Sequence, residues 1–435
     1  MAIVGGGFTG MWSAWWLKQW APDLDVALIE ADACGRGPSG RNGGFCNSLW
    51  FSLPTLVDRF GDDGALEVCR AAEASVRQVG EWCEQHGVDA RFHHGGYLQT
   101  ATCEAQEGAW QPVHREMRRL GVPELAVELN QEEIAARCAS PRFRSAALYS
   151  TAATVDPARL ADGLRTRLLG AGVRIYEGTA MRWLKRGQAR AEIEVEGGSL
   201  RAPQVVLGNG TGLLRVGGLR RALTTTSSHM VITEPVPDVL DELGWTGGEC
   251  ITDSRAMIHY FRTTIDGRIA FGWGGGKIVL GSRVGQRVEV DPGMARQVEE
   301  HMRSFFPQLE GRRVVHAWGG PIDVSPSHLP VIRSLGSRVH AGFGYTGNGV
   351  GPSQLLGRML ASLALDGSGP QLPAPALVDP PGTSVPPEPF RFVGGSVIRS
   401  AILRKERIQE QGGAPGPVTR LLSGIPERLG IHVGR

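Results

Sequence analysis

The chain has 435 residues, 41% of them hydrophobic and 21% charged, and a formal net charge of +2. This length and composition predict a globular protein with a large core and two intertwined domains. The small net charge gives no electrostatic reason to expect a nucleic acid partner. The seven cysteines are scattered and form no C-x-x-C pair, which argues against a disulfide framework or a zinc site and favours reduced thiols in a cytoplasm.

The first feature along the chain is a glycine-rich turn, Gly5-x-Gly7-x-x-Gly10, between a short apolar run and a helix-capable stretch. This order predicts a strand, a tight turn and a helix, which is the dinucleotide-binding fingerprint. Gly5 permits the turn, Gly7 lets the backbone approach a pyrophosphate, and Gly10 lets the helix pack on the strand. A flexible loop without a ligand is the alternative interpretation.

A second apolar run, residues 25–29, ends at Glu30, about 20 residues past the last glycine, where such units place an acid on the adenosine ribose. The sequence therefore predicts a bound adenine dinucleotide. A turn at residue 5 leaves no room for a secretion signal, and no apolar run approaches the roughly 18 residues of a membrane span. We expect a cytoplasmic protein, although the strand ahead of Gly5 is short enough that its start can lie upstream.

Residues 34–45 (CGRGPSGRNGGF) are too rich in glycine to predict a helix or a strand. Their N–H groups and Arg41 are candidates to line a ligand, and an exposed surface loop is the alternative. Residues 53–121 show mainly helical periodicity, interrupted by a strand-like GGYLQTA, and indicate a separate layer.

The next segment, VDPARLADGLRTRLLGAGVRIYEGTAM, predicts a helix with proline just inside its start and then a strand. The strand-like APQVVL that ends in GNGTG repeats the pattern of a nucleotide-binding domain. Residues 224–320 are rich in strands and predict a second domain built on an antiparallel sheet.

A second glycine loop opens a helix in RVHAGFGYTGNGVGPSQLLGRMLASLAL, with Pro352 near its first turn. Free N–H groups at a helix start around Gly347 to Val350 would stabilise the negative charge that a reduced flavin gathers near N1 and O2. A nicotinamide does not need this second dipole. The pattern therefore favours a flavin, and a tight structural turn is the alternative.

Residues 366–390 are rich in Pro, Gly and Ser and predict a linker, and residues 391–435 predict a basic tail with a short helix at VIRSAILRKERIQEQ. From Phe390 onward eight basic residues face three acidic ones. A helix that binds a membrane surface or a partner is one interpretation. A solvated helix packed on the rest of the protein is the one we favour.

Several motifs together resemble the FAD-dependent D-amino acid oxidase superfamily, in its glycine/sarcosine oxidase-like branch, and SGRNGG is most similar to the gamma-glutamylputrescine oxidase type. The motifs occur in family order over roughly residues 1–365: GGGFTG with Glu30, SGRNGGF, TVDPARLADGL, GNG, TEP, YFRTTIDGRIAFG, WGGPIDVSPSHLPVI and GFGYTGNGVGPS.

The resemblance implies an α/β fold with a Rossmann-like FAD-binding domain that is discontinuous in sequence, and a substrate domain with an antiparallel sheet over the flavin. The expected FAD-binding domain comprises residues 1–50, 150–222 and 320–365, and the substrate domain comprises residues 51–149 and 223–319. The resemblance also implies oxidation of a C–N bond of an amine or amino acid to an imine by hydride transfer to flavin N5, with O2 or another acceptor as oxidant.

Carried onto this chain, the family pattern implies a set of cofactor-binding residues. They are Gly5, Gly7, Phe8, Thr9, Gly10, Glu30, Ala31, Ser39, Gly40, Arg41, Asn42, Gly43, Gly44, Met181, Gly208, Asn209, Gly210, Gly344, Gly347, Asn348, Gly349 and Val350. Met181 corresponds to the strand that the family places beside adenine. Where family members attach FAD through a cysteine this chain has Gly320, and the SGRNGG loop has no histidine, so FAD is predicted to be noncovalent.

The catalytic candidates are Arg268, Tyr260 and Arg41. Arg268 corresponds to a lysine over the flavin that helps oxygen react in sarcosine oxidase-like members, and arginine cannot give up its proton in the same way. Tyr260 is a candidate wall for a neutral amine, as are Trp273 and Trp318, although such aromatic residues are more often core or sheet residues than substrate contacts.

Arg41, Arg262 and Arg268 are candidates to hold a substrate carboxylate, with surface salt bridges as the alternative. The histidines show no metal-ligand spacing, and no metal is predicted. The competing interpretations are an NAD-dependent dehydrogenase and a noncatalytic flavoprotein whose tail binds a partner.

Overall fold

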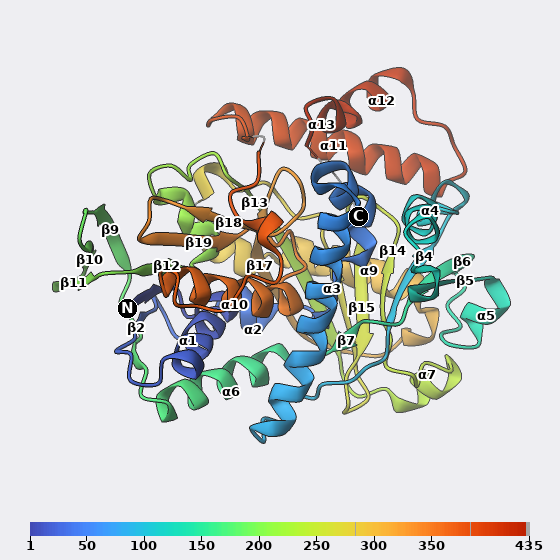
Figure 1. The fold of residues 1–435 in the computed structure, drawn as a ribbon. Helices are drawn as coiled ribbons and strands as arrows, with labels where there is room; N and C mark the ends of the chain where they lie inside the picture. The colour runs from blue at the N-terminus through green and yellow to red at the C-terminus, as the bar shows by residue number, and fades with distance from the viewer. Residues whose placement is uncertain (283, 383, 432–435) are drawn as a thin grey trace.

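The computed structural model describes residues 1–282, 284–382 and 384–431 (Figure 1). Two large sheets divide the molecule, one of six strands and one of eight. Segments from the beginning, middle and end of the chain contribute to the six-stranded sheet, as the sequence predicts for a discontinuous domain.

The six-stranded sheet has the order β18-β19-β12-β1-β2-β8. Its strands are β1 (Ala2–Val4), β2 (Ala27–Ile29), β8 (Arg174–Tyr176), β12 (Val205–Leu207), β18 (Val331–Ser334) and β19 (Val339–Phe343). All neighbours pair in parallel except β18 and β19. β1, β2, β12 and β19 are buried on both faces, which explains why they read as continuous apolar runs rather than alternating ones.

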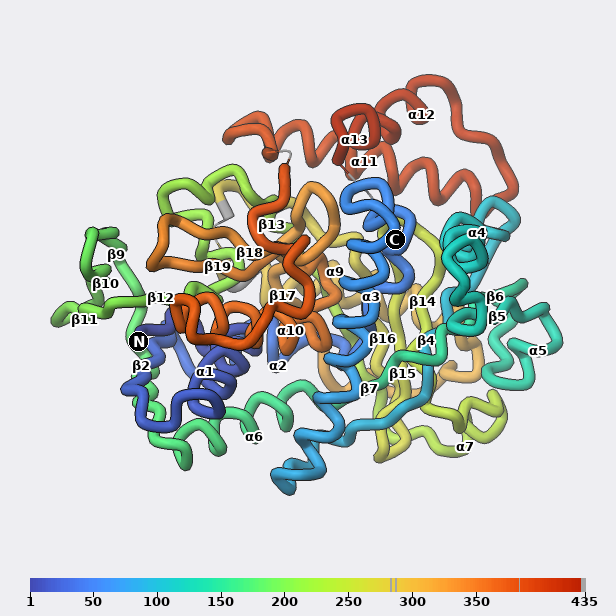
Figure 2. The backbone as a smooth tube through the Cα atoms, viewed as in Figure 1, coloured from blue at the N-terminus to red at the C-terminus, as the bar shows by residue number. Residues whose placement is uncertain are grey.

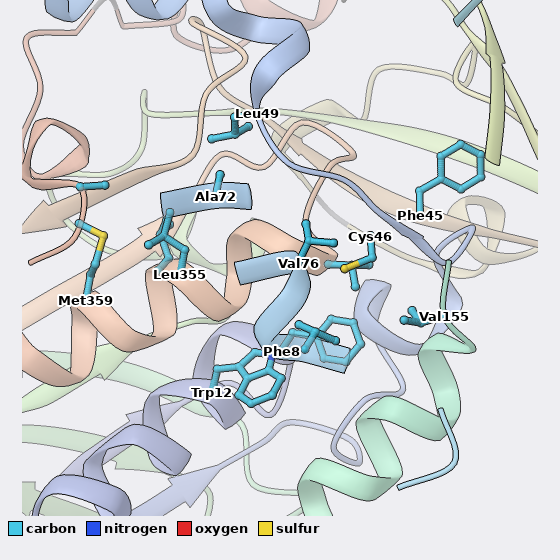
Figure 3. Packing of buried hydrophobic residues seen from close by; sticks show 14 of the residues in the cluster. Phe8, Trp12, Phe45, Cys46, Leu49, Ala72, Val76, Val155, Leu355 and Met359 are labelled. Atoms are coloured by element: carbon cyan, nitrogen blue, oxygen red, sulfur yellow. The ribbon is translucent and has the colours of Figure 1, made fainter. Parts of the chain in front are cut away.

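Helices cover one face of this sheet. They are α1 (Phe8–Trp20), α6 (Pro157–Gly170) and α10 (Val350–Ala364), and the 33-residue α3 (Leu53–Gln85) packs on α10 from outside. Figure 3 shows Trp12, Val76 and Leu355 from three of these helices within one apolar cluster. Gly357 permits the closest approach, since a Cβ there would lie 2.5 Å from the Cβ of Trp12.

A three-stranded antiparallel sheet covers the other face of the six-stranded sheet. Its strands are β9 (Met181–Arg186), β10 (Ala191–Val195) and β11 (Gly198–Ala202). Ile193 of this sheet belongs to the same apolar cluster as Val4 and Val205. The six-stranded sheet is therefore the middle of three layers.

The eight-stranded sheet has the order β17-β13-β16-β15-β14-β4-β6-β5. Its strands are β4 (Tyr97–Ala101), β5 (Ala126–Leu129), β6 (Ser145–Tyr149), β13 (Thr224–Thr233), β14 (Cys250–Asp253), β15 (His259–Thr263), β16 (Ile269–Trp273) and β17 (Val314–Val324). Every pair is antiparallel except β14 with β4. Helix α9 (Pro292–Phe305) packs on one face through an apolar cluster, so the opposite face of the central strands is free to line a site.

Part of the glycine-rich loop at residues 34–45 is regular, contrary to our sequence-based expectation. Pro38 at the first turn starts a short helix, α2 (Pro38–Arg41), and β3 (Phe45–Cys46) pairs with β7 (Ala153–Thr154). Proline is pre-organised for a helix start, and this local effect outweighed the glycine content.

The C-terminal segment forms α11 (Phe390–Glu410), α12 (Pro417–Ser423) and α13 (Ile425–Arg428). The predicted tail helix is confirmed, and it is longer than expected. Figures 1 and 2 show α11 crossing the top of the molecule, from above the region of β13 to the region of α4 (Gln111–Arg119). The tail thus spans both halves of the fold.

Candidate active site

A cavity of about 670 Å³ lies between the two large sheets and beneath the C-terminal helices. Its walls come from five parts of the chain: the start of α1 and the α2 loop, the strands β13, β15 and β17, the loop and start of α10, the inner face of α11, and the residues around α13. Its lining is mainly apolar, with a few polar groups, which is the usual character of a small-molecule site.

The start of α1 is built around glycines that no larger residue can replace. Gly5 has φ of 103°, and a Cβ on it would lie 2.8 Å from the backbone of Gly208 and Asn209. A Cβ on Gly10 would lie 2.0 Å from the carbonyl oxygen of Gly5. The turn therefore brings the first strand, the helix and the end of β12 into direct backbone contact.

The N–H groups at this helix start are available to a ligand. The N–H of Phe8 donates to Ser39 Oγ at 2.9 Å, whereas those of Gly7, Thr9 and Gly10 donate to no acceptor in the described part of the chain. The amide oxygen of Asn209 is buried and accepts no hydrogen bond from the described residues. The N–H groups fit a pyrophosphate, because a helix N-terminus attracts phosphate oxygens. The oxygen of Asn209 is an acceptor and needs a donor such as a hydroxyl.

Glu30 stands at the end of β2. Its Oε2 accepts from the N–H of Gly6 at 2.7 Å, and its Oε1 accepts from the N–H of Asp32 at 3.0 Å. The carbonyl oxygen of Glu30 accepts from the N–H of Thr179 at 2.7 Å, which brings Met181 of β9 to the same edge of the sheet. A carboxylate held in this way keeps lone pairs for ribose hydroxyls.

The second helix start, at α10, faces the cavity with Gly347, Gly349 and Val350. Their N–H groups also have no acceptor in the residues that the structure describes. Asp323 Oδ2 accepts from the N–H of Gly344 at 2.7 Å and so fixes the loop ahead of the helix. Burial raises the pKa of Asp323 to about 6, although the bond from Gly344 acts in the opposite direction.

The eight-stranded sheet contributes Tyr260 to the wall opposite these helix starts. Ser228 Oγ donates to the carbonyl oxygen of Trp273 at 2.9 Å, so its single proton is used. The hydroxyl of Tyr260, 2.8 Å from Ser228 Oγ, must therefore donate to it, which leaves the phenol oxygen with lone pairs. Burial raises the pKa of Tyr260 to about 12, so this oxygen is a neutral acceptor at physiological pH.

Of the other aromatic candidates, Trp318 lines the cavity and donates from Nε1 to the carbonyl oxygen of Arg41 at 2.8 Å. Trp273 is buried and does not line the cavity. It packs near His259, which bonds to Asp253 at 2.7 Å. His259 is thus a buried residue whose ring nitrogens both have partners.

The arginine candidates fall into three different places. Arg41 lines the cavity and is paired with Glu289 at 3.1 Å. Arg262 does not line it and instead donates to the carbonyl oxygens of Gly43 at 2.6 Å and Val155 at 2.9 Å, which holds the glycine loop in place. Its role is therefore structural.

Arg268 requires a correction. We expected it over the flavin, but it does not line the cavity and lies at the turn between β15 and β16, paired with Asp266 at 2.6 Å. The antiparallel register places Gly272, rather than the start of β16, opposite Tyr260. Arg268 is therefore at the wrong end of its strand to act on oxygen.

Sequence reasoning also missed the contribution of the tail. Ile398, Arg399 and Ile402 of α11, together with Ile425 and Leu429, line the cavity. A helix periodicity predicts which residues share a face, but not which distant loop that face covers, so no local signal could have found these contacts.

Glu406 fastens α11 to the cavity wall. Its Oε1 accepts from the N–H groups of Ala256 at 2.7 Å and Met257 at 3.2 Å, and both of these residues line the cavity. Glu410, one turn further on, pairs with Arg142 at 2.5 Å and with Arg255. The buried Glu406 and the partly buried Glu410 therefore attach α11 to the strands and loops beneath it.

Comparison with known proteins agrees with this geometry. The family described as FAD dependent oxidoreductase, DAO, matches residues 1–363. The chain belongs to this family. It is 28% identical over 423 residues to a probable oxidoreductase, OrdL, of Rhizobium meliloti strain 1021, covering 93% of this chain and 89% of that one.

Two further relatives are similar to this DAO-family chain. The gamma-glutamylputrescine oxidoreductase of Escherichia coli K12 is 27% identical over 375 residues, which covers 83% of each chain. The crystal structure of glycine oxidase from Geobacillus kaustophilus has a TM-score of 0.68 and 20% identity, and covers 84% of this chain and 94% of that one. The expected α/β fold is confirmed.

Membership of this family shows that the protein is an FAD-dependent oxidoreductase, so the NAD-dependent alternative is wrong. The two helix starts and Glu30 fit FAD. The seven cysteines are buried, and none of them is among the described residues that line the cavity. Noncovalent attachment of FAD stays a prediction. Among the described helices, none is long and apolar enough to cross a bilayer. The cytoplasmic location stays a prediction.

Proposed function

We propose that this DAO-family enzyme oxidises a C–N bond of an amine or amino acid to an imine, which water then hydrolyses. The observation that carries the proposal is the hydrogen bonding of Tyr260, a residue that lines the cavity together with two helix starts and whose hydroxyl, by donating to Ser228, keeps a neutral acceptor oxygen. An amine N–H is the natural donor to such an oxygen. The printed names of the relatives, an oxidoreductase of gamma-glutamylputrescine and a glycine oxidase, support the same class of substrate.

The apolar walls serve the amine in a second way. Met230, Trp318 and Ile322 line the same cavity as Tyr260 and give it apolar walls. Low polarity disfavours the ammonium form and lowers the pKa of a bound amine. The nitrogen then keeps the lone pair that assists loss of hydride from the neighbouring carbon, while Tyr260 holds one of its N–H groups.

Bound FAD would supply the hydride acceptor for this reaction, with O2 or another compound as the final electron acceptor. The N–H groups of Gly347, Gly349 and Val350, which have no acceptor among the described residues, would place the positive end of a helix dipole beside the flavin. Arg262 holds the backbone of Gly43 against the ring of Tyr260, where a Cβ at Gly43 would come within 3.0 Å. The distance between the glycine-rich loop at residues 34–45 and the strand that carries Tyr260 is therefore fixed by direct contact.

The test is an anaerobic absorbance scan of the purified holoenzyme between about 300 and 550 nm, with amines and amino acids added one at a time. Bleaching by one substrate class supports the proposal and identifies the half-reaction. Persistent absorbance with every compound would contradict it and favour the noncatalytic flavoprotein. Admitting air after bleaching then measures whether O2 is the acceptor, because an oxidase recovers its spectrum rapidly.

A further inference from the structure

Three arginines, Arg41, Arg391 and Arg399, are among the described residues that line the cavity. Two of them are neutralised, since Arg41 pairs with Glu289 at 3.1 Å and Arg391 pairs with Glu388 at 2.8 Å. Arg399, on α11, forms no ion pair with any residue in the described ranges. It is therefore the cavity arginine that has a positive charge to offer a ligand.

The guanidinium of Arg399 is held in place from one side only. Nε donates to the carbonyl oxygens of Gly275 at 3.0 Å and Gly276 at 2.7 Å, and Nη2 also donates to Gly275. Nη1 makes no hydrogen bond to the part of the chain that the structure describes. The side chain is thus oriented by the loop that follows β16 and keeps unused donors.

The charge on Arg399 is also partly desolvated. Burial lowers its pKa, and no carboxylate acts against that shift. Asp323, the carboxylate among the described lining residues, is not in ion-pair contact with it. The carbonyl groups of Gly275 and Gly276 are the acceptors that compensate the charge of Arg399 among the described residues. A planar guanidinium that keeps N–H donors in an apolar cavity binds a carboxylate strongly.

The neighbours on the same helix set the surroundings of this receptor. Ile398 and Ile402 line the cavity on either side of Arg399 along the chain, so a bound carboxylate would be shielded from water. Helix α11 lies wholly beyond residue 363, where the family match ends. The receptor therefore belongs to the tail and not to the part of the chain that carries the family motifs.

We propose that Arg399 binds a carboxylate of the substrate, so that the enzyme prefers amines that carry a carboxylate to simple amines. This inference rests on the proposed function. It makes the C-terminal helix a determinant of specificity, with Tyr260 holding the amine nitrogen and Arg399 holding the acidic group. Arg399 is then the residue that selects among compounds whose C–N bond is equally reactive.

The test measures binding to the holoenzyme by isothermal titration calorimetry, with butyrate and 1-butanol as probes of equal length. The wild type should bind butyrate at least about 10-fold more tightly than 1-butanol, because a charged hydrogen bond in a shielded site contributes on that order. Arg399→Gln should abolish this preference by weakening butyrate binding much more than 1-butanol binding. Arg399→Lys should retain part of it, since the charge remains but the fork is lost.

Arg404→Gln is the matched control, because Arg404 lies on the same helix but is exposed and does not line the cavity. Its butyrate preference should equal that of the wild type. A purely structural role for Arg399 would weaken binding of both probes together. The inference is overturned if the wild type shows no preference for butyrate, a result that needs no variant to fold, or if Arg399→Gln keeps the preference.

Failure of the proposed function is recognised separately. If no amine bleaches the flavin but butyrate binding still depends on Arg399, the amine oxidation is wrong and the carboxylate site stands. If amines bleach the flavin and Arg399→Gln binds butyrate as the wild type does, the oxidation stands and the carboxylate site is wrong.

Discussion

Glu30→Gln is the most direct test of the cofactor site. The carboxylate accepts the N–H of Gly6 at 2.7 Å through one oxygen and that of Asp32 at 3.0 Å through the other. A glutamine has the same shape but only one acceptor oxygen. Its NH2 group must then face one of these N–H donors or turn away from it. Either arrangement leaves a donor unpaired and removes the negative charge next to the expected ribose.

The expected magnitude follows from these contacts. A hydrogen bond to a charged group contributes about 1.5–3 kcal/mol, and an unpaired donor costs a similar amount. Loss of one such interaction on the bound ribose corresponds to roughly a 10- to 100-fold increase in the Kd for FAD, because about 1.4 kcal/mol is a factor of ten. The bonds to Gly6 and Asp32 exist without cofactor, so their loss lowers the stability of the apoprotein as well.

The assay is recovery of flavin absorbance when stripped apoprotein is titrated with FAD, together with the melting temperature of each apoprotein. Asp32→Asn is the control, since Asp32 is exposed and its side chain makes no hydrogen bond to the described residues. It should bind FAD as the wild type does. A Kd for Glu30→Gln within about threefold of the wild type would refute the assignment of Glu30 to the ribose, since one charged hydrogen bond predicts at least tenfold.

Three further changes test other parts of the argument. Tyr260→Phe should slow anaerobic bleaching of the flavin by the best amine roughly 10-fold or more. The pH dependence of the bleaching rate should not change below pH 10, because the pKa of Tyr260 is about 12. An unchanged rate would exclude the contact between Tyr260 and the amine. Gly10→Ala should lower the melting temperature and abolish FAD binding, since its Cβ would lie 2.0 Å from an oxygen, whereas Gly37→Ala, with nothing within 4 Å, should behave as the wild type. Burial raises the pKa of Glu406 from 4.5 to about 7, so the folded protein keeps a proton that the unfolded chain loses, and stability falls as the pH rises through that window. Glu406→Gln should remove this fall and exceed the wild type by up to roughly 3 kcal/mol at pH 8 in urea melts, and parallel pH curves for the two proteins would contradict this.

The features that the sequence predicts well are those encoded by neighbouring residues. The glycine turn and Glu30 lie within one strand–helix–strand unit, and their spacing predicts both the fold of that unit and its ligand. The helix that begins at Pro157 is confirmed with Asp156 as its N-cap, which accepts from two N–H groups of the first turn at 3.1 Å. Such signals depend on local geometry and need no knowledge of the tertiary structure.

The missed features depend on contacts between distant segments. Arg268 was misplaced because a family motif gives the order of strands but not the register that decides which residue faces the cavity. Glu406 accepts hydrogen bonds from Ala256 and Met257, which lie 150 and 149 residues earlier in the chain. Arg399 donates hydrogen bonds to Gly275 and Gly276, which follow β16 and lie 124 and 123 residues earlier in the chain. Charge and periodicity indicate that the tail is a basic helix, and they contain no information about the surface that it covers.

The position of β1 in the middle of its sheet has a consequence for synthesis of the protein. Ala2–Val4 pairs with residues 205–207 on one side, and that strand pairs in turn with residues 339–341. The ribosome releases the glycine turn first, but the sheet that supports it stays incomplete until more than three quarters of the chain has emerged. Such long-range pairing is slow and leaves strand edges exposed meanwhile. We therefore expect the nascent protein to depend on chaperones and to acquire its cofactor only after translation is nearly finished.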